Sequence, residues 1–126
     1  MTTRFSIFTP THNVSHLDRL ARSIERQTFR DFEWVVAPNN GATSQDVRVW
    51  AGESAKLAAY RSDTESVGEL KRFATMSATG DILVEVDHDD EITPDCLEHL
   101  AAAFDDPAVD FVYSNSCEIK DGQPFT

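Results

Sequence analysis

The chain of 126 residues is poor in cysteine, in basic residues and in long apolar runs. Its two cysteines, Cys96 and Cys117, fit neither a C-x-x-C motif nor a zinc-ligand spacing, so we expect reduced thiols in a cytoplasmic protein. No run approaches the roughly 18 apolar residues of a transmembrane helix. Only 11 Lys and Arg stand against 22 Asp and Glu, and the resulting net charge of −11 argues against nucleic-acid binding and against docking on an anionic membrane.

The remaining composition is that of a globular domain, with 40% hydrophobic and 26% charged residues. Short apolar runs alternate with segments of helical periodicity, and no repeat or linker divides the chain. The apolar runs predict strands at residues 5–8, 32–37, 56–61, 82–86 and 109–113. The alternation predicts a single α/β domain over residues 1–126, a three-layer sandwich with a mainly parallel central sheet.

Helices are predicted between these strands by apolar faces and by local signals. A short helix is expected over residues 44–52. A second helix is expected to begin near Ser66 and to end at Gly80. Pro10 is expected to end the first strand, and Asp121 with Gly122 predicts a hairpin turn. Three pairs are typical of helix N-termini: Ser15 with Asp18, Ser66 with Glu69, and Thr93 with Pro94.

The strongest chemical signal is a group of carboxylates after the strand predicted at residues 82–86: Asp87, Asp89, Asp90 and Glu91. Crowded carboxylates repel one another, so a cation or a raised pKa is needed to keep them together. In an extended segment Asp87 and Asp89 would face one ion, and oxygen ligands suit Mg²⁺ or Mn²⁺. In parallel α/β sheets, ligands gather where strands end, which selects residues 9–13, 38–41 and 87–91.

Two other interpretations of the acidic segment stay open. It could be a solvated acidic turn that also caps the next helix. It could also be a calcium loop of the EF-hand type, with Asp87, Asp89, Glu91 and Glu98 at positions one, three, five and twelve. However, Ile92 holds the position that requires Gly in such a loop, and a strand rather than a helix precedes it.

Three stretches resemble family 2 glycosyltransferases with the GT-A fold. Residues 5–13 (FSIFTPTHN) resemble their opening strand, and residues 27–34 (QTFRDFEW) resemble their helix-to-second-strand junction. Residues 78–83 (ATGDIL), followed by 87–90 (DHDD), resemble the stretch that leads into their metal-binding DXD motif. The match covers about residues 5–104 in the right order and spacing. It implies a nucleotide-diphosphate sugar donor, a divalent cation (Mn²⁺ or Mg²⁺) and transfer of the sugar to an acceptor hydroxyl with inversion.

The resemblance also implies site residues by position. Asp89 would bind the cation directly, and Asp87 would lie by the donor ribose and the waters of the metal. Lys71 would face the donor diphosphate, with Arg72 as its neighbour, although a solvated helix face is the plain alternative. The nucleoside pocket would be lined by a further set of residues: Thr9, Pro10, Asn13, Asn39 and Asn40.

The sequence departs from the family at Asn39 and Asn40, where a pair of Asp is usual and one of them reads the nucleobase. A neutral amide can donate and accept hydrogen bonds, so base recognition remains possible. Asn followed by Gly is also common turn chemistry. The nucleotide is therefore left open.

The family's general base is a carboxylate beyond the strand predicted at residues 109–113, so no catalytic residue is assigned. We interpret the chain as the donor-binding half of a glycosyltransferase, with the acceptor-binding half lying outside it. His12 and His88 are interpreted as polar loop residues. A non-catalytic nucleotide-sugar-binding or interaction module is the alternative. A nucleotidyltransferase ranks lower because residues 9–13 hold no Gly, Lys or Arg. An open sheet edge would favour self-association into a homo-oligomer.

Overall fold

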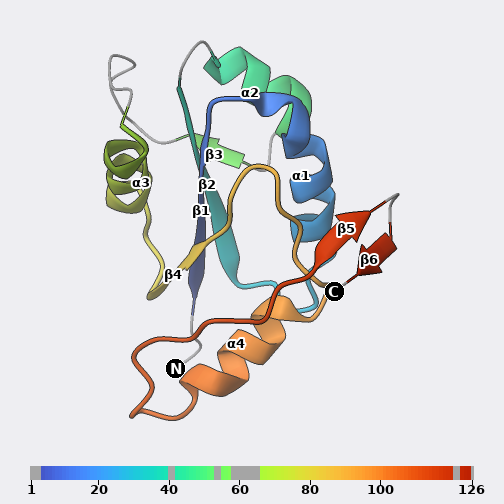
Figure 1. Cartoon of the computed structure of the whole chain (residues 1–126). Helices are drawn as coiled ribbons and strands as arrows, with labels where there is room; N and C mark the ends of the chain where they lie inside the picture. The colour runs from blue at the N-terminus through green and yellow to red at the C-terminus, as the bar shows by residue number, and fades with distance from the viewer. Residues whose placement is uncertain (1–3, 40–41, 53–54, 58–65, 121–122, 126) are drawn as a thin grey trace.

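The computed structural model describes residues 4–39, 42–52, 55–57, 66–120 and 123–125. Its centre is a parallel four-stranded sheet in the order β3-β2-β1-β4 (Figure 1). The register sets Phe5 opposite both Phe32 and Ile82. The predicted α/β class with a parallel sheet is confirmed. The strands are β1 (Phe5–Thr11), β2 (Phe32–Pro38), β3 (Ala55–Leu57) and β4 (Ile82–Glu85).

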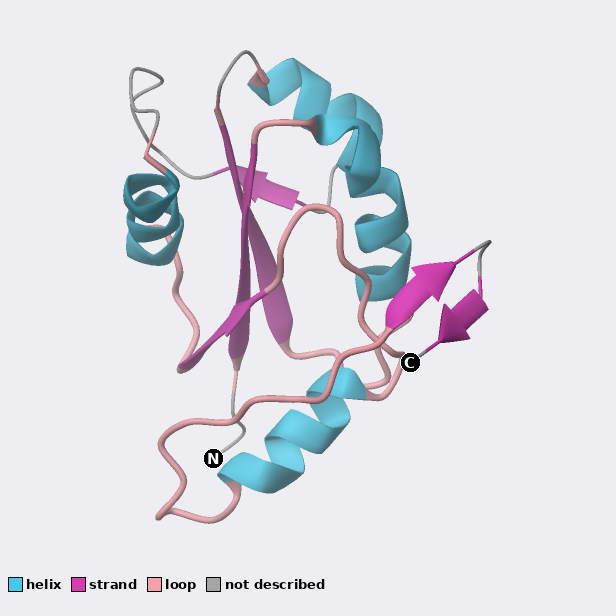
Figure 2. Ribbon diagram, in the orientation of Figure 1, coloured by secondary structure: helices cyan, strands magenta, loops and turns pink. Residues whose placement is uncertain are grey.

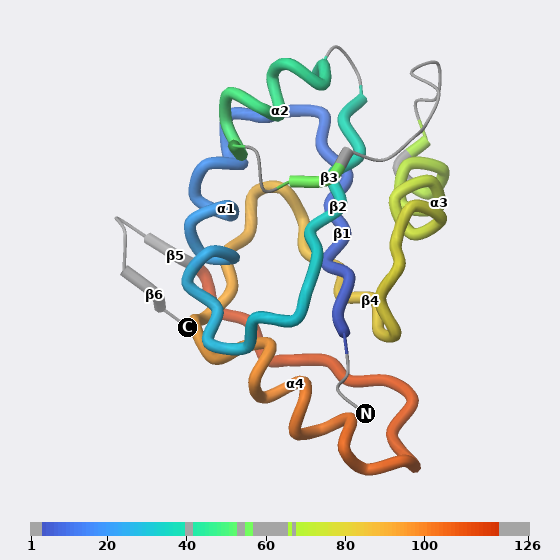
Figure 3. Tube along the Cα trace, turned by 180° about the vertical axis from the view of Figure 1, so that it is seen from behind, coloured from blue at the N-terminus to red at the C-terminus, as the bar shows by residue number. Residues whose placement is uncertain are grey.

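Helices cover both faces of this sheet (Figure 2). The short turn η1 (Val14–His16) leads into α1 (Leu17–Glu25), which lies with α2 (Ser44–Ala51) on one face. Helix α3 (Val67–Met76) covers the other face, so the three-layer arrangement is confirmed. Helix α4 (Cys96–Phe104) lies at the end of the sheet where β1 begins, as the view from behind also shows (Figure 3). An antiparallel pair, β5 (Glu118–Lys120) and β6 (Gln123–Phe125), follows.

Each face of the sheet has its own hydrophobic core, because neighbouring strand residues point to opposite faces. Ile7 and Trp34 pack with α1 and α2, whereas Phe8 and Val35 pack against Leu70 and its neighbours on α3. All seven residues of β1 are buried, as expected for a strand that is covered on both faces. The apolar residues among them, from Phe5 to Phe8, are the run from which the sequence predicted a strand.

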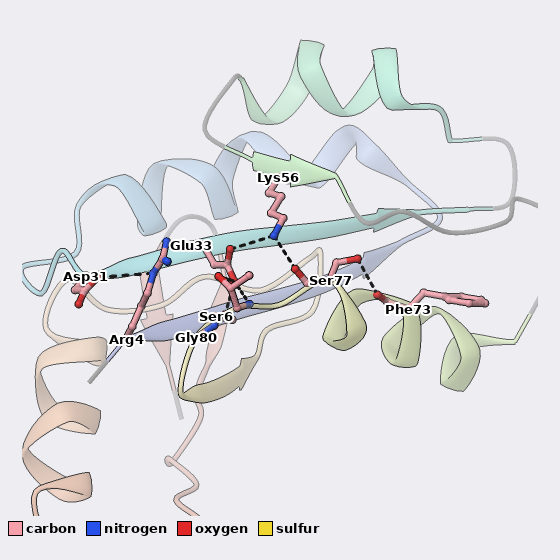
Figure 4. A network of polar contacts seen from close by, with 9 residues as sticks. Arg4, Ser6, Asp31, Glu33, Lys56, Phe73, Ser77 and Gly80 are labelled. Carbon is pink, nitrogen blue, oxygen red and sulfur yellow. Dashed lines mark hydrogen bonds and ion pairs between the residues drawn. The ribbon is translucent and has the colours of Figure 1, made fainter. Parts of the chain in front are cut away.

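A polar network joins the strands at the end of the sheet where they begin (Figure 4). The Glu33 carboxylate accepts hydrogen bonds from Ser6 Oγ (2.6 Å) and from the Thr79 N–H (2.5 Å), and it lies 3.4 Å from Lys56 Nζ. Ser6 Oγ in turn accepts from the Gly80 N–H (2.7 Å). Burial alone would raise the pKa of Glu33, but these hydrogen bonds and the Lys56 charge lower it to about 2. The network therefore ties the α3–β4 connection to the first three strands.

One predicted helix start is confirmed and one is wrong. Ser66 accepts a hydrogen bond from the Glu69 N–H (3.3 Å) at the start of α3, as the spacing predicted. Ser15 does not cap α1, because its own N–H donates to Asn13 Oδ1 (3.1 Å), which caps η1. Asp18 instead forms an ion pair with Arg22 one turn later in α1.

The last helix also begins later than predicted. It starts at Cys96, and its N-cap residue makes no side-chain cap bond. The side chain of buried Gln27 donates to the Thr93 carbonyl (2.7 Å) and accepts from the Leu97 N–H (3.0 Å). The Thr93 carbonyl also accepts from the Cys96 N–H (3.0 Å), so Thr93 and Pro94 form a turn before the helix, and Gln27 rather than Thr93 accepts from an N–H of its first turn.

Two strand predictions are wrong: the first strand is longer than predicted, and the strand predicted at residues 109–113 is not formed. Pro10 does not end β1, which runs on to Thr11 and pairs Pro10 with Ala37. The described residues 109–113 form no strand, and Phe111 and Tyr113 are 82% and 84% exposed. A strand needs a partner, and within the described residues no strand lies along the outer edge of β4. Self-association through that edge remains a prediction.

Gly80 does not end α3, which stops at Met76 with Ser77 as its C-cap residue. The expected helix at residues 44–52 is α2, which begins with a capping box between Thr43 and Asp46. Residues 58–61 of the expected third strand, and Asp121 with Gly122, lie outside the described residues. The strands that flank that turn do pair, with Lys120 opposite Gln123. No helix in the described ranges has the length and apolar character needed to cross a bilayer.

Candidate functional site

The parallel strands bring the segments after β1, β2 and β4 to one edge of the sheet. The Val86 N–H donates to the Phe8 carbonyl (3.2 Å), which holds the loop after β4 against β1. The Asn39 N–H donates to the Thr11 carbonyl (2.8 Å), which holds the segment after β2 against the end of β1. Residues 9–13, 38–39 and 86–91 therefore share the edge at which α/β sheets bind ligands.

Three carboxylates gather at this edge. Asp87, Asp89 and Asp90 offer oxygens that all lie within 4.8 Å of one another, and all three residues are exposed. The Asp90 N–H donates to the Asp87 carbonyl (3.1 Å), so the segment turns rather than running straight. We call these three residues the acidic cluster. The sequence analysis included Asp90 in the group of carboxylates but assigned only Asp87 and Asp89 to the ion, because an extended segment would have pointed Asp90 away.

The acidic cluster is electrostatically crowded. Partial burial raises the pKa of Asp90, and the charges of Asp89 and Asp87 raise it further. Within the described residues, no Arg or Lys forms an ion pair with any of the three carboxylates. Three convergent hard oxygen donors without a basic partner fit a divalent cation of the Mg²⁺ or Mn²⁺ type.

Lys71 extends from α3 toward the same edge. Its ammonium forms an ion pair with Glu85, the last residue of β4, and its side chain is 35% exposed. The hydrogen bond to Glu85 raises the pKa of Lys71 despite some burial, and the charges of Glu85 and Asp87 add to the increase. Lys71 thus stands as a firmly protonated cation beside the acidic cluster, whereas its neighbour Arg72 is exposed.

The predicted pocket residues on β1 are core residues with little open surface. Thr9 is fully buried, and its Oγ1 accepts a hydrogen bond from Trp34 Nε1 (3.0 Å). Pro10 is buried as well. Asn13 is exposed, but its side chain is engaged in the cap of η1. A ligand bound where the strands end would lie over Thr9 and Pro10 without contacting their buried side chains.

Of the two asparagines after β2, the structure describes Asn39 and not Asn40. Asn39 is 5% exposed, and its carbonyl accepts a hydrogen bond from the Ala42 N–H (3.1 Å). It therefore shapes the turn and also lies beside Thr11 at the edge. Both interpretations made from the sequence, turn chemistry and a place at the binding edge, are compatible with this position.

The structure also places three histidines here, and the sequence analysis had interpreted two of them, His12 and His88, as polar loop residues. The His12 and His88 rings stand edge to face with centroids 4.9 Å apart, and the His16 ring lies 5.9 Å from that of His88. Spacing along the chain gave no signal for this contact, because residues 12 and 88 meet only through the pairing of β1 with β4.

A family model described as "Glycosyl transferase family 2" matches residues 6–125. The chain belongs to that family. The structure of S. aureus TarS 1–349 is similar to it with a TM-score of 0.70 and 27% identity, over 81% of this chain and 32% of that one. The same protein in complex with UDP-GlcNAc gives a TM-score of 0.69 and 27% identity, over 81% and 31%.

A mannosyltransferase from Pyrobaculum calidifontis, solved in complex with GDP-Man and Mn²⁺, shares the fold with a TM-score of 0.67 at 23% identity, over 95% of this chain and 36% of that one. This family 2 chain therefore has the expected GT-A architecture. It spans about a third of the length of these solved proteins. A search of curated protein sequences found no significant match.

Proposed function

We propose that this chain binds the nucleotide-diphosphate sugar donor of a glycosyltransferase through a divalent cation held by the acidic cluster. The observation that carries the proposal is the convergence of Asp87, Asp89 and Asp90 at the ligand-binding edge without a basic partner among the described residues. A cluster that serves only as a solvated turn does not require three carboxylates within 4.8 Å.

Net charge explains why a cation would be needed. A diphosphate would be repelled by a chain of charge −11, and most strongly by the acidic cluster itself. Bound Mn²⁺ or Mg²⁺ would reverse the local sign and stabilise charge on the departing diphosphate. Lys71 supplies the protein's own cation beside the cluster, and a diphosphate arriving there would compete with Glu85 for its ammonium.

The nucleoside end of the donor is assigned to the rim next to the acidic cluster. Thr9 and Pro10 would lie beneath the nucleoside without exposing their side chains to it, and Asn13, Asn39 and Asn40 would surround it. The TarS structures with UDP and UDP-GlcNAc, at 27% identity, support uridine nucleotides as the first donors to test. The amide of Asn39 would replace a carboxylate as the reader of the base.

Sugar transfer with inversion needs a general base at the acceptor hydroxyl. We assign that base to no residue of this chain, and we place the acceptor-binding half of the enzyme outside residues 1–126. The chain matches 32% of TarS 1–349, which supports the view that one part of a larger catalytic unit is represented here. On this proposal, donor binding is the activity to measure.

The test is titration calorimetry of the chain with UDP, UDP-GlcNAc and GDP-mannose, each with Mn²⁺ and with chelator. We expect binding of at least one nucleotide in Mn²⁺ and at least about tenfold weaker binding with chelator. Asp89→Asn should weaken Mn²⁺-dependent binding about 100-fold, and Lys71→Met should weaken it less. Asp110→Asn, at an exposed residue outside the edge, is the matched control. Equal nucleotide affinity in Asp89→Asn and wild type would contradict the proposal and favour a binding or interaction module of another kind.

A further inference from the structure

Glu85 is the one charged residue of β4, whose other residues are Ile82, Leu83 and Val84. In the register with β1 it lies opposite Phe8, whose side chain belongs to the core beneath α3. Paired residues of parallel strands share a face, so the Glu85 side chain lies on the α3 side of the sheet. This side chain is 50% exposed. Packing of β4 therefore does not require a carboxylate at this position, and the residue can serve another role.

The Glu85 carboxylate forms an ion pair and a hydrogen bond with the ammonium of Lys71. Lys71 stands on α3 next to Leu70, which is buried in the core between α3 and the sheet. The Lys71 side chain is 35% exposed, so a ligand can reach its ammonium. The charge of Asp87 adds to the raised pKa of Lys71, which indicates that the pair borders the acidic cluster. The lysine at this edge is therefore already paired within the chain.

The ion pair alters what Lys71 offers to an anion. Two opposite unit charges in contact nearly cancel at a distance, so a paired lysine attracts a phosphate less than an unpaired one does. Exposed ion pairs are weak, because salt screens them and the ordering of two long side chains opposes them. A diphosphate carries more negative charge than a single carboxylate, so it can take the place of Glu85. The replacement is thus possible, but it lowers the affinity for the diphosphate.

We propose that Glu85 competes with the donor diphosphate for Lys71 and so limits the affinity of the site for nucleotide diphosphates. Glu85 is a positioning residue in this scheme, because it acts through Lys71 and not on the donor itself. A diphosphate that binds displaces the carboxylate, and the carboxylate pairs with the ammonium again as the nucleotide diphosphate leaves after sugar transfer. The pair therefore favours release of that product. This inference rests on the proposed donor binding and adds a residue that controls its strength.

The test is titration calorimetry with UDP and with GDP in Mn²⁺, on the wild type, Glu85→Gln, Lys71→Met and the double variant. We expect Glu85→Gln to bind the nucleotide about twofold to fivefold more tightly than the wild type, which corresponds to the strength of an exposed ion pair. In the Lys71→Met background the same substitution should give less than about half of that gain, because no ion pair remains to be broken.

Glu25→Gln is the matched control, because it removes the same charge from an exposed residue of α1. Its nucleotide affinity should stay within about 1.5-fold of the wild-type value, since distant exposed charges are screened. Thermal unfolding followed by circular dichroism checks that each variant folds.

A measurement on the wild-type chain keeps the proposal testable if Lys71→Met binds nucleotide too weakly to be measured. In Mg²⁺, which is diamagnetic, saturating UDP or GDP should shift the side-chain carboxyl ¹³C resonance of Glu85. The shift should be toward the position of that resonance in Lys71→Met without nucleotide. The corresponding resonance of Glu25 should stay unchanged.

Weaker nucleotide binding in Glu85→Gln than in the wild type would mean that Glu85 orients Lys71 for the donor, and it would overturn the inference. Equal gains with and without Lys71 would also overturn it, because Glu85 would then act only by repelling the diphosphate. An unmoved Glu85 carboxyl resonance in the nucleotide-bound wild type has the same consequence. In all three cases the proposed donor binding stands. Absence of UDP and GDP binding in the wild type is a different result, which contradicts the proposed function and with it this inference.

Discussion

Carboxylates at the two ends of the central sheet differ in burial, in hydrogen-bond partners and in the direction of their pKa shifts. Where the strands begin, Glu33 is enclosed, accepts hydrogen bonds from two other segments and has a pKa lowered to about 2. Where the strands end, Asp87, Asp89 and Asp90 lie exposed and within 4.8 Å of one another, and the pKa of Asp90 is raised. The protein itself supplies the partners of Glu33, whereas among the described residues no Arg or Lys forms an ion pair with the acidic cluster, to which we assign a divalent cation in our proposal.

On the proposed function, this difference separates a structural role of Glu33 from a binding role of the acidic cluster. A buried carboxylate with several donors strengthens the fold, because its removal leaves those donors unpaired. Exposed carboxylates that repel one another weaken the fold slightly, and such a cost is typical of residues kept for binding. Substitutions at the two ends should therefore affect different measurements.

The largest effect on stability is expected from Glu33→Ala. Buried Ser6 and the Thr79 N–H would lose their acceptor, and Lys56 would lose its ion-pair partner, so we expect a loss of about 3 kcal/mol in the free energy of unfolding. Urea unfolding followed by circular dichroism measures it. Glu25→Ala, at an exposed residue of α1, should change stability by less than about 0.5 kcal/mol. Equal losses in the two variants would remove the distinction between the ends of the sheet.

Gly80→Ala is expected to have the next largest effect. A Cβ at this position would lie 2.6 Å from Ser6 Oγ, 2.8 Å from Ser6 N and 2.9 Å from the Arg4 carbonyl oxygen. Since two of these atoms are backbone, the clash cannot be relieved by a rotamer change, and we expect a loss of about 1–3 kcal/mol. Gly68→Ala in α3 would meet only Ser66 Oγ at 3.6 Å. That control should be neutral or stabilising by up to about 1 kcal/mol, and a larger loss there than at Gly80 would contradict the prediction.

The contribution of Glu33 should depend on pH. Its pKa is lowered on folding from 4.5 to about 2, so the stabilisation is complete above pH 4.5 and is lost as the pH falls toward 2. The stability difference between wild type and Glu33→Gln should therefore be constant near neutrality and shrink through this window. Urea titrations at a series of pH values measure it. A difference that stays the same down to pH 2 would mean that the carboxylate is not the source of the stability.

The smallest effect is expected at the opposite end. Without divalent cation, Asp89→Asn relieves repulsion within the acidic cluster, so the melting temperature should rise by about 1–3 °C. Because exposed charges are screened by salt, the gain should shrink in about 1 M NaCl. Differential scanning calorimetry in chelator measures both values. A fall in melting temperature on neutralising Asp89 would show that the carboxylate supports the fold, as Glu33 does.

Most strands and helices could be predicted from the sequence because their signals lie within the segments themselves. The buried run of β1 and the Ser66 cap could be identified without knowledge of the rest of the chain. Two of the errors depend on residues that lie far apart in the sequence. The side chain of buried Gln27, rather than Thr93, accepts from the Leu97 N–H at the start of α4. Residues 109–113 lie beside no neighbouring strand within the described residues. Neither feature can be predicted from the residues next to it in the sequence.

The residues of the candidate site, like the elements of the fold, could be predicted only in part from the sequence. Asp87 and Asp89 were found because they follow an apolar strand, but the turn that adds Asp90 depends on backbone geometry. The meeting of His12 with His88 follows from the pairing of β1 with β4 and not from any motif. Sequence thus indicated the kind of chemistry at this edge, and the structure supplied which side chains meet there.

Paramagnetic broadening by Mn²⁺ in the ¹H–¹⁵N spectrum of the chain tests the central claim most directly, because it reports both ends of the sheet at once. Substoichiometric Mn²⁺ should broaden the amides of residues 86–91 first and leave those around Glu33 and Gly80 sharp. Asp89→Asn should remove that selective broadening. Broadening spread evenly over the acidic surface, or unchanged in Asp89→Asn, would contradict the assignment of a divalent-cation site to the acidic cluster.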